Sequence, residues 1–277
     1  MIKLFLGFLV AICCVASFST VTRAETALFF APSRVELSGE KPVDEIRVTN
    51  MSSIARSYRI LLQDIVMSED GGTNRVDGFE YSAKRMLRYV PRQFVLKPGE
   101  RQIIRIMARY PEGTPDGAYH AHLEFLEDIG KRSEVNGLDD DDVEARARMM
   151  AQISYSTAVP VVLSKGQLET DIDMADIVLG KDVNGVNELN LTLLRSGNGQ
   201  GNALIDVDYV APDGSVKKAA SQRSVAIYRE IDKRYHKFIL DLLNEGELKA
   251  GGHLEVKLSN RDLSGQPPIK AMSVSVP

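Results

Sequence analysis

Two histidines and a glutamate alternate along one predicted strand, at a spacing that could bind zinc. His120, His122 and Glu124 lie two residues apart, so an extended backbone would place all three side chains on one face. Histidine and carboxylate groups are zinc ligands, but a complete site needs a further ligand, and His236 or His253 would have to supply it from another part of the chain. The polar outer face of a sheet explains these residues without a metal, and we expect that arrangement.

Other catalytic patterns are weaker. The glycine-rich stretch 197–201 could cradle a phosphate only if a helix followed it, and the residues that follow alternate like a strand. The chain has no Gly-x-Ser-x-Gly motif, and no pair of carboxylates is placed by pattern in a cleft. We therefore expect a turn at 197–201, no enzymatic activity and no cofactor.

The charge balance argues against nucleic acid as a partner. The chain of 277 residues has 34 lysines and arginines against 38 aspartates and glutamates, a net charge of −4. Binding to phosphates requires a basic excess or a clustered basic face. Tryptophan is absent as well, so a stacking platform for bases is not expected.

The first 24 residues have the form of a signal peptide. A positive charge at Lys3 precedes the apolar run 4–15, and Ala24 is a small residue suited to cleavage before Glu25. The run is too short to span a bilayer, so we expect an exported, periplasmic protein without membrane insertion after cleavage. Cys13 and Cys14 both lie in this segment, which leaves the mature chain without disulfides or a thiol nucleophile.

The rest of the chain is dominated by short stretches with a period of two, separated by Gly and Pro turns. Such a pattern predicts an all-β protein, and seven strands before residue 165 is the number of an immunoglobulin-like sandwich. A polar stretch at 68–78 is expected to be a connection. The strands expected in this half cover residues 28–37, 43–50, 58–66, 86–96, 101–110, 118–126 and 148–163.

The second half repeats the plan, so we expect domains at 25–165 and 166–277. Residues 235–243 also fit one face of a helix, and this alternative stays open. The strands expected in this half cover residues 168–179, 188–194, 203–210, 216–228, 235–243, 253–258 and 269–276.

The strand at 148–163 is longer than one small sheet needs. Its first part alternates apolar and polar residues, and its second part contains Pro160, which cannot donate to a ladder and indicates a sheet edge or a strand end. The acidic residues Asp139–Asp142 and Glu144 come before it. A solvated loop explains that cluster, and calcium binding is the alternative.

Residues 88–125 contain a strand with Pro91, a turn at Pro98-Gly99 and a following strand with Gln102-x-x-Arg105. This stretch resembles the periplasmic chaperones of the chaperone-usher pathway, the PapD-like family that assembles pili and fimbriae. The opening strand APSRVEL and the step VTNMSS are also similar to the family. The resemblance implies two immunoglobulin-like β-sandwich domains in a boomerang arrangement. The residues that carry it are Pro91, Arg92, Leu96, Pro98, Gly99, Gln102 and Arg105.

The resemblance also implies a binding mode. The last strand of the first domain would lend side chains to a pilin-like subunit that lacks its own final strand, by β-strand addition. Arg34 would hold the subunit's terminal carboxylate, while the family's second cation, a lysine, has no counterpart in SYSTAVPVVL, and Lys165 comes later along the strand. The lent side chains would be Met149, Ala151, Ile153, Tyr155 and Thr157.

The partners implied are pilin or fimbrial subunits and an outer-membrane usher, and the same edge could pair with a second copy of the chain. The alternative function is an exported structural or adhesion protein of two β-sandwiches, with this strand internally covered. A metal-assisted enzyme using His120 and His122 is the third hypothesis.

Overall fold

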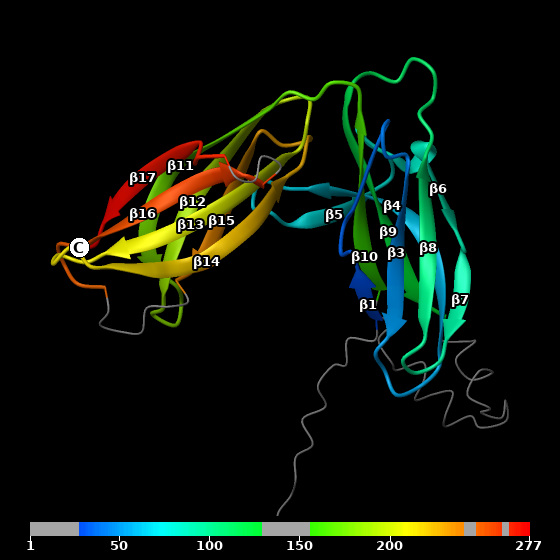
Figure 1. Ribbon diagram of the computed structural model, residues 1–277, viewed down its shortest axis with the longest axis horizontal. Helices are drawn as coiled ribbons and strands as arrows, with labels where there is room; N and C mark the ends of the chain where they lie inside the picture. Colours follow the sequence, from blue (N-terminus) through cyan, green and yellow to red (C-terminus); the bar gives the residue numbers. More distant parts are fainter. Residues whose placement is uncertain (1–27, 129–155, 241–247, 262–265) are drawn as a thin grey trace, which may run out of the picture.

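The computed structural model describes residues 28–128, 156–240, 248–261 and 266–277. Apart from one 3₁₀ turn, Lys84–Met86, the regular elements in these ranges are β-strands. They form two lobes that meet at an angle, each with two sheets (Figure 1). The expectation of an all-β protein with two sandwiches is confirmed. In the described ranges, no helix is long and apolar enough to cross a membrane.

The N-terminal sandwich is built from two sheets. One sheet has the order β1-β3-β8-β6, and the other has the order β2-β10-β9-β4-β5, with β7 also paired to β4. The strands are β1 (Leu28–Ala31), β2 (Val35–Ser38), β3 (Val43–Asn50), β4 (Arg56–Met67), β5 (Thr73–Val76), β6 (Leu87–Val90), β7 (Gln93–Leu96), β8 (Arg101–Ala108), β9 (Gly117–Glu127) and β10 (Ser156–Lys165).

Prolines mark the places where a predicted strand divides between the sheets. The stretch 28–37 becomes β1 and β2, which lie in different sheets on either side of Pro32. Pro91 divides 86–96 into β6 and β7 in the same way. A proline lacks the N–H that a continuous ladder would use, so the chain leaves one sheet there and enters the other.

The expectation of a plain connection at 68–78 is wrong. Thr73–Val76 forms β5, which pairs with Asp64–Met67 of β4. Its residues are exposed or half-buried, so it has no apolar alternation by which the sequence could have revealed it.

The C-terminal sandwich places the sheet β11-β12-β15 against the sheet β14-β13-β16-β17. Residues 233–239 pair with Glu188–Leu194 as a strand, so the helical alternative is wrong there because ladder bonds to β12 are available. The strands are β11 (Thr170–Lys181), β12 (Asn187–Gly197), β13 (Gly201–Val210), β14 (Val216–Ile227), β15 (Lys233–Ile239), β16 (His253–Asn260) and β17 (Lys270–Ser275).

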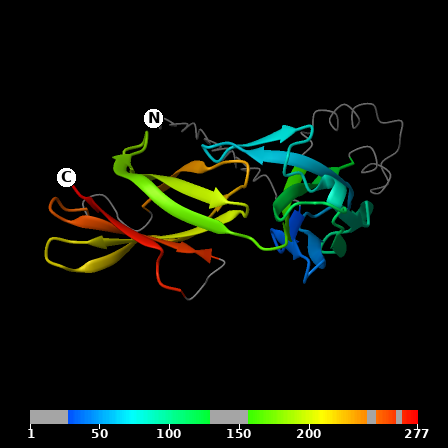
Figure 2. The same cartoon turned by 90° about the horizontal axis from the view of Figure 1, so that it is seen from above.

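The two sandwiches are joined by the short segment between β10 and β11 (Figure 2). Polar contacts also cross their boundary. The backbone N–H of Ala118 donates to the carbonyl of Asn198 at 2.9 Å. The N–H of Met67 donates to Glu230 Oε1 at 2.8 Å. These bonds use backbone groups of β9 and β4, so they hold the sheet containing β10 against the second domain.

Candidate functional site

Strand β10 has a partner on both sides along only part of its length. It pairs with β9 from Ser156 to Lys165, but its parallel pairing with β2 covers only Val161–Ser164. Within the described ranges, the segment 156–160 therefore has an open edge. Unpaired N–H and C=O groups on such an edge can accept another strand.

Of the five predicted lent side chains, the last one along the chain lies on the described part of this open edge. Thr157 is exposed and has the parity of Val159, Val161 and Leu163, whose side chains lie in the core. The other four, Met149, Ala151, Ile153 and Tyr155, lie outside the described residues, and their role stays a prediction.

The direction of β2 determines where an added strand would end. Strand β2 runs parallel to β10 and starts its pairing at Val35, opposite Val161. A strand that filled the open edge in the same direction would end with its carboxyl group before Val35. Arg34 is the residue that comes immediately before that position.

Arg34 lies at the boundary between the domains. Its Nε donates to Glu36 Oε1 at 2.7 Å, and its Nη2 donates to Gln200 Oε1 at 2.8 Å. Gln200 belongs to the turn between β12 and β13 of the second domain. The guanidinium is thus held at the boundary by both domains, with its Nη1 outside these two bonds.

A cavity of about 320 Å³ opens beside Arg34. It combines three cationic and two anionic side chains and is lined by Pro32, Arg34, Glu36, Lys41, Asp44 and Arg261. Lys165 uses its ammonium elsewhere, because its Nζ donates to the carbonyl of Thr114 and lies 3.4 Å from Asp116 Oδ1.

The polar face of β9 that carries His120, His122 and Glu124 is not an outer face of the protein, contrary to the expectation from the sequence. They do lie opposite the core side of β9, but they are 2%, 6% and 2% exposed. The ring of Tyr228, from the second domain, lies 4.4 Å from the ring of His120 and covers this face. Glu124 forms an ion pair with Arg75 of β5.

Burial makes both histidines poor bases. It lowers the pKa of His122 to about 4, helped by His120 and Arg34, and it also lowers the pKa of His120. His120 Nε2 lies 3.1 Å from the carbonyl oxygen of Ile65. Both rings are therefore neutral at neutral pH, as expected for packing groups.

The zinc hypothesis gains no support from this geometry. Among the described residues, no group of three or more His, Cys, Asp or Glu side chains could hold a metal ion. The two candidates for a further ligand lie in different sheets of the second domain, His236 on β15 and His253 on β16.

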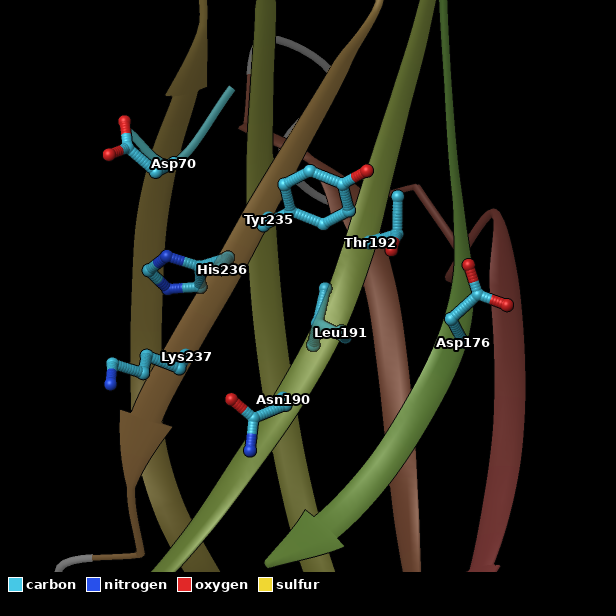
Figure 3. A pocket seen from close by; sticks show the side chains of 8 residues that line it. All are labelled: Asp70, Asp176, Asn190, Leu191, Thr192, Tyr235, His236 and Lys237. Carbon is cyan, nitrogen blue, oxygen red and sulfur yellow. The ribbon is translucent and has the colours of Figure 1, made fainter. Parts of the chain in front are cut away.

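A second cavity, of about 420 Å³, lies on the sheet β11-β12-β15. Figure 3 shows Asp70 and Asp176 on opposite sides of Tyr235 and Thr192, rather than together as a catalytic pair. The tyrosine is 50% exposed. The groove is open, and its side chains do not form a nucleophile and base.

No family model matches the sequence, and no curated protein matches it. Solved structures are similar in fold. The class 5 fimbriae chaperone CfaA shares 13% identity, with 90% of this chain and 99% of that chain covered and a TM-score of 0.44. A chain of the CsuC–CsuE chaperone–tip adhesion subunit complex of Acinetobacter baumannii shares 11%, with 89% and 96% covered and a TM-score of 0.42. The E. coli chaperone DraB shares 13%, with 90% and 96% covered and a TM-score of 0.39.

Proposed function

We propose that the protein is a chaperone that binds pilin-like subunits by adding its strand β10 to their incomplete sandwiches. The observation that supports this function is the interrupted edge of β10, which is paired with β2 from Val161 to Ser164 and open at 156–160 in the described chain. Adding a strand to an open edge satisfies backbone groups of both partners.

The affinity would come from two sources. Main-chain hydrogen bonds along β10 fix the direction and register of the added strand. The five lent side chains would each contribute up to about 1.5–3 kcal/mol when buried, on the order of 10 kcal/mol gross. Loss of translational freedom and ordering of the strand would reduce this value considerably.

Arg34 is the proposed anchor for the subunit's terminal carboxylate. A guanidinium can make two parallel charge-assisted hydrogen bonds to a carboxylate. Its position just before Val35 is where the end of a strand parallel to β10 would arrive.

The remaining parts of the proposal rest on the form of the first 24 residues and on the resemblance to the PapD-like chaperones. Residues 1–24 would be removed on export to the periplasm, and the bound subunit would be delivered to an outer-membrane usher. The function is not enzymatic and uses no cofactor, because a second subunit's strand can displace the chaperone by exchange.

The test compares two neighbouring substitutions in the full chain. Ile153→Asp would place a charge among the predicted lent side chains, while Ser154→Asp would place the same charge on the opposite face of the strand that the sequence predicts. We expect the wild type and the Ser154 variant to co-purify from the periplasm with a small β-rich subunit, identified by mass spectrometry. The Ile153 variant should lose it.

Two results would contradict the proposal. If all three proteins retain the subunit equally, it is not bound by strand addition. If no subunit binds the wild type when its candidate clients are co-expressed, the structural or adhesion function becomes the better explanation.

A further inference from the structure

The cavity beside Arg34 contains one cation that has no acidic partner among the residues that the structure describes. Glu36 is paired with Arg34 at 2.7 Å, and Asp44 is paired with Lys41 at 2.6 Å. Arg261, the third cation of the lining, has a single hydrogen bond among the described residues, from its Nη1 to Ser224 Oγ at 3.3 Å. The described lining of the cavity therefore carries an excess positive charge, which favours an anion.

The backbone that precedes Arg261 is supported by the same part of the second domain that holds Arg34. Strand β16 ends at Asn260, which pairs with Ala203 of β13. Gln200, which accepts from Arg34, comes just before β13. The two arginines thus approach one cavity from different domains. The turn at 197–201 contacts Arg34 through Gln200 and leads into β13, which pairs with the end of β16 next to Arg261.

The added strand of the proposed function brings an anion to this cavity. A strand parallel to β10 would end before Val35, beside Arg34. Nη1 of Arg34 is not used in its bonds to Glu36 and Gln200. A carboxylate there could accept from Arg34 on one side and from Arg261 on the other.

We propose that Arg261 is the second cation that binds the terminal carboxylate of the subunit, opposite Arg34. This inference rests on the proposed function. It makes capture a property of both domains, because the two arginines bind one carboxylate only while the domains keep their relative orientation. It also predicts a preference for a strand that ends beside Arg34 over a strand that continues past it.

The experiment uses the full chain and the subunit that the wild type co-purifies with. Dissociation constants are measured for this subunit and for a form extended by glycines at its C-terminus, which displaces the carboxylate. The variants are Arg261→Ala, Arg261→Lys and Lys217→Ala. Lys217 is an exposed cation of the same domain outside the cavity, so its variant controls for net charge.

We expect Arg261→Ala to weaken binding of the natural subunit about tenfold, the value of one charge-assisted hydrogen bond. The extension should weaken wild-type binding but add little in this variant, since both changes remove the same contact. Arg261→Lys should retain part of the affinity, and Lys217→Ala should match the wild type.

Three outcomes would overturn the inference. They are unchanged binding by Arg261→Ala, an equal loss in Lys217→Ala, or a weakened Arg261→Ala variant that responds to the extension as strongly as the wild type. In each case the loss caused by Ile153→Asp would persist, so the proposed function would stand. If the wild type binds no subunit, both proposals fail.

Discussion

The rings of His120 and Tyr228 meet across the domain boundary, with their centroids 4.4 Å apart. His122 lies beside them, 6.2 Å from Tyr228 by ring centroids. Neither histidine touches bulk water to any extent, and the charged groups around them are Arg34, Glu230 and Asp64. Protonation of either ring would place a cation in a contact that is closed to solvent.

The stability of the protein should therefore fall as the pH drops from 6.5 to 4. The pKa of His122 is about 4 in the folded chain and about 6.5 in the unfolded chain. The unfolded state binds the proton first, so acid favours unfolding in this window. Because only the unfolded chain takes up a proton on His122 in this range, the unfolding free energy should fall by about 3 kcal/mol.

Urea unfolding followed by circular dichroism would measure this effect. Compared with the wild type, His122→Gln should lose about 2 kcal/mol less of its unfolding free energy between pH 7 and pH 4.5. His253→Gln is a control, since that histidine is half-exposed on β16. Equal pH dependence in wild type and His122→Gln would show that His122 is not the group responsible.

The contrast between the two faces of β9 shows what the sequence could predict. The core positions Ala121, Leu123 and Phe125 follow from alternation alone, and they are 0–1% exposed. Alternation also assigns His120 and His122 to the opposite face, but it cannot say what covers that face. A second domain covers it, through contacts between residues more than a hundred positions apart.

The same limit applies to the candidate site. Arg34 could be selected because the stretch APSRVEL resembles the opening strand of a known family. Arg261 could not be selected, because it belongs to no recognised motif. Only the fold brings it to a cavity that is lined by residues of both domains.

Glu36 should restrain the binding of an anion by Arg34. Its carboxylate accepts from Arg34 Nε at 2.7 Å and is itself 58% exposed. Under the proposed function, Glu36→Gln removes a competing negative charge, so subunit binding should tighten several-fold and the association rate should rise most at low salt. Stability should change by less than about 1 kcal/mol, since the pair is close to solvent.

The matched control for this charge change is Glu40→Gln. Glu40 is exposed and lies outside the cavity lining. If both variants accelerate association equally, the effect comes from net charge and not from the release of Arg34.

Asn50 is a structural residue, although Asn50-Met51-Ser52 matches a glycosylation pattern. Its side chain is 0% exposed. Its Nδ2 donates to the carbonyls of Ile54 at 2.8 Å and Leu96 at 2.9 Å. In Asn50→Asp, a carboxylate oxygen would replace the donating Nδ2 and repel these two carbonyl oxygens. The substitution should therefore lower the unfolding free energy by about 3 kcal/mol or more.

Asn74→Asp gives the same chemical change on the exposed strand β5. It should alter the unfolding free energy by less than about 0.5 kcal/mol. A similar cost in the two variants at pH 7 would mean that the bonds of Asn50 contribute little.

Gly197 should be intolerant of any side chain, and its replacement should reach the candidate site. Its φ is +89°, and a Cβ there would lie 2.0 Å from the carbonyl oxygen of Glu169, which is backbone and cannot swing away. Gly197→Ala should therefore cost about 3 kcal/mol or more, against about 1 kcal/mol for Gly214→Ala. Gly214 has a φ of +82° with no atom within 4 Å of its Cβ position, so it isolates the cost of the backbone conformation.

The functional consequence of this substitution follows from the turn that Gly197 begins. Gln200 of that turn accepts from Arg34 at 2.8 Å, and the carbonyl of Asn198 accepts from Ala118 at 2.9 Å. Relief of the clash requires the turn to move, which removes these links between the domains. At a temperature where Gly197→Ala remains folded by circular dichroism, its subunit affinity should fall while that of Gly214→Ala stays at the wild-type value. Full affinity in the folded Gly197→Ala protein would show that the turn does not support Arg34.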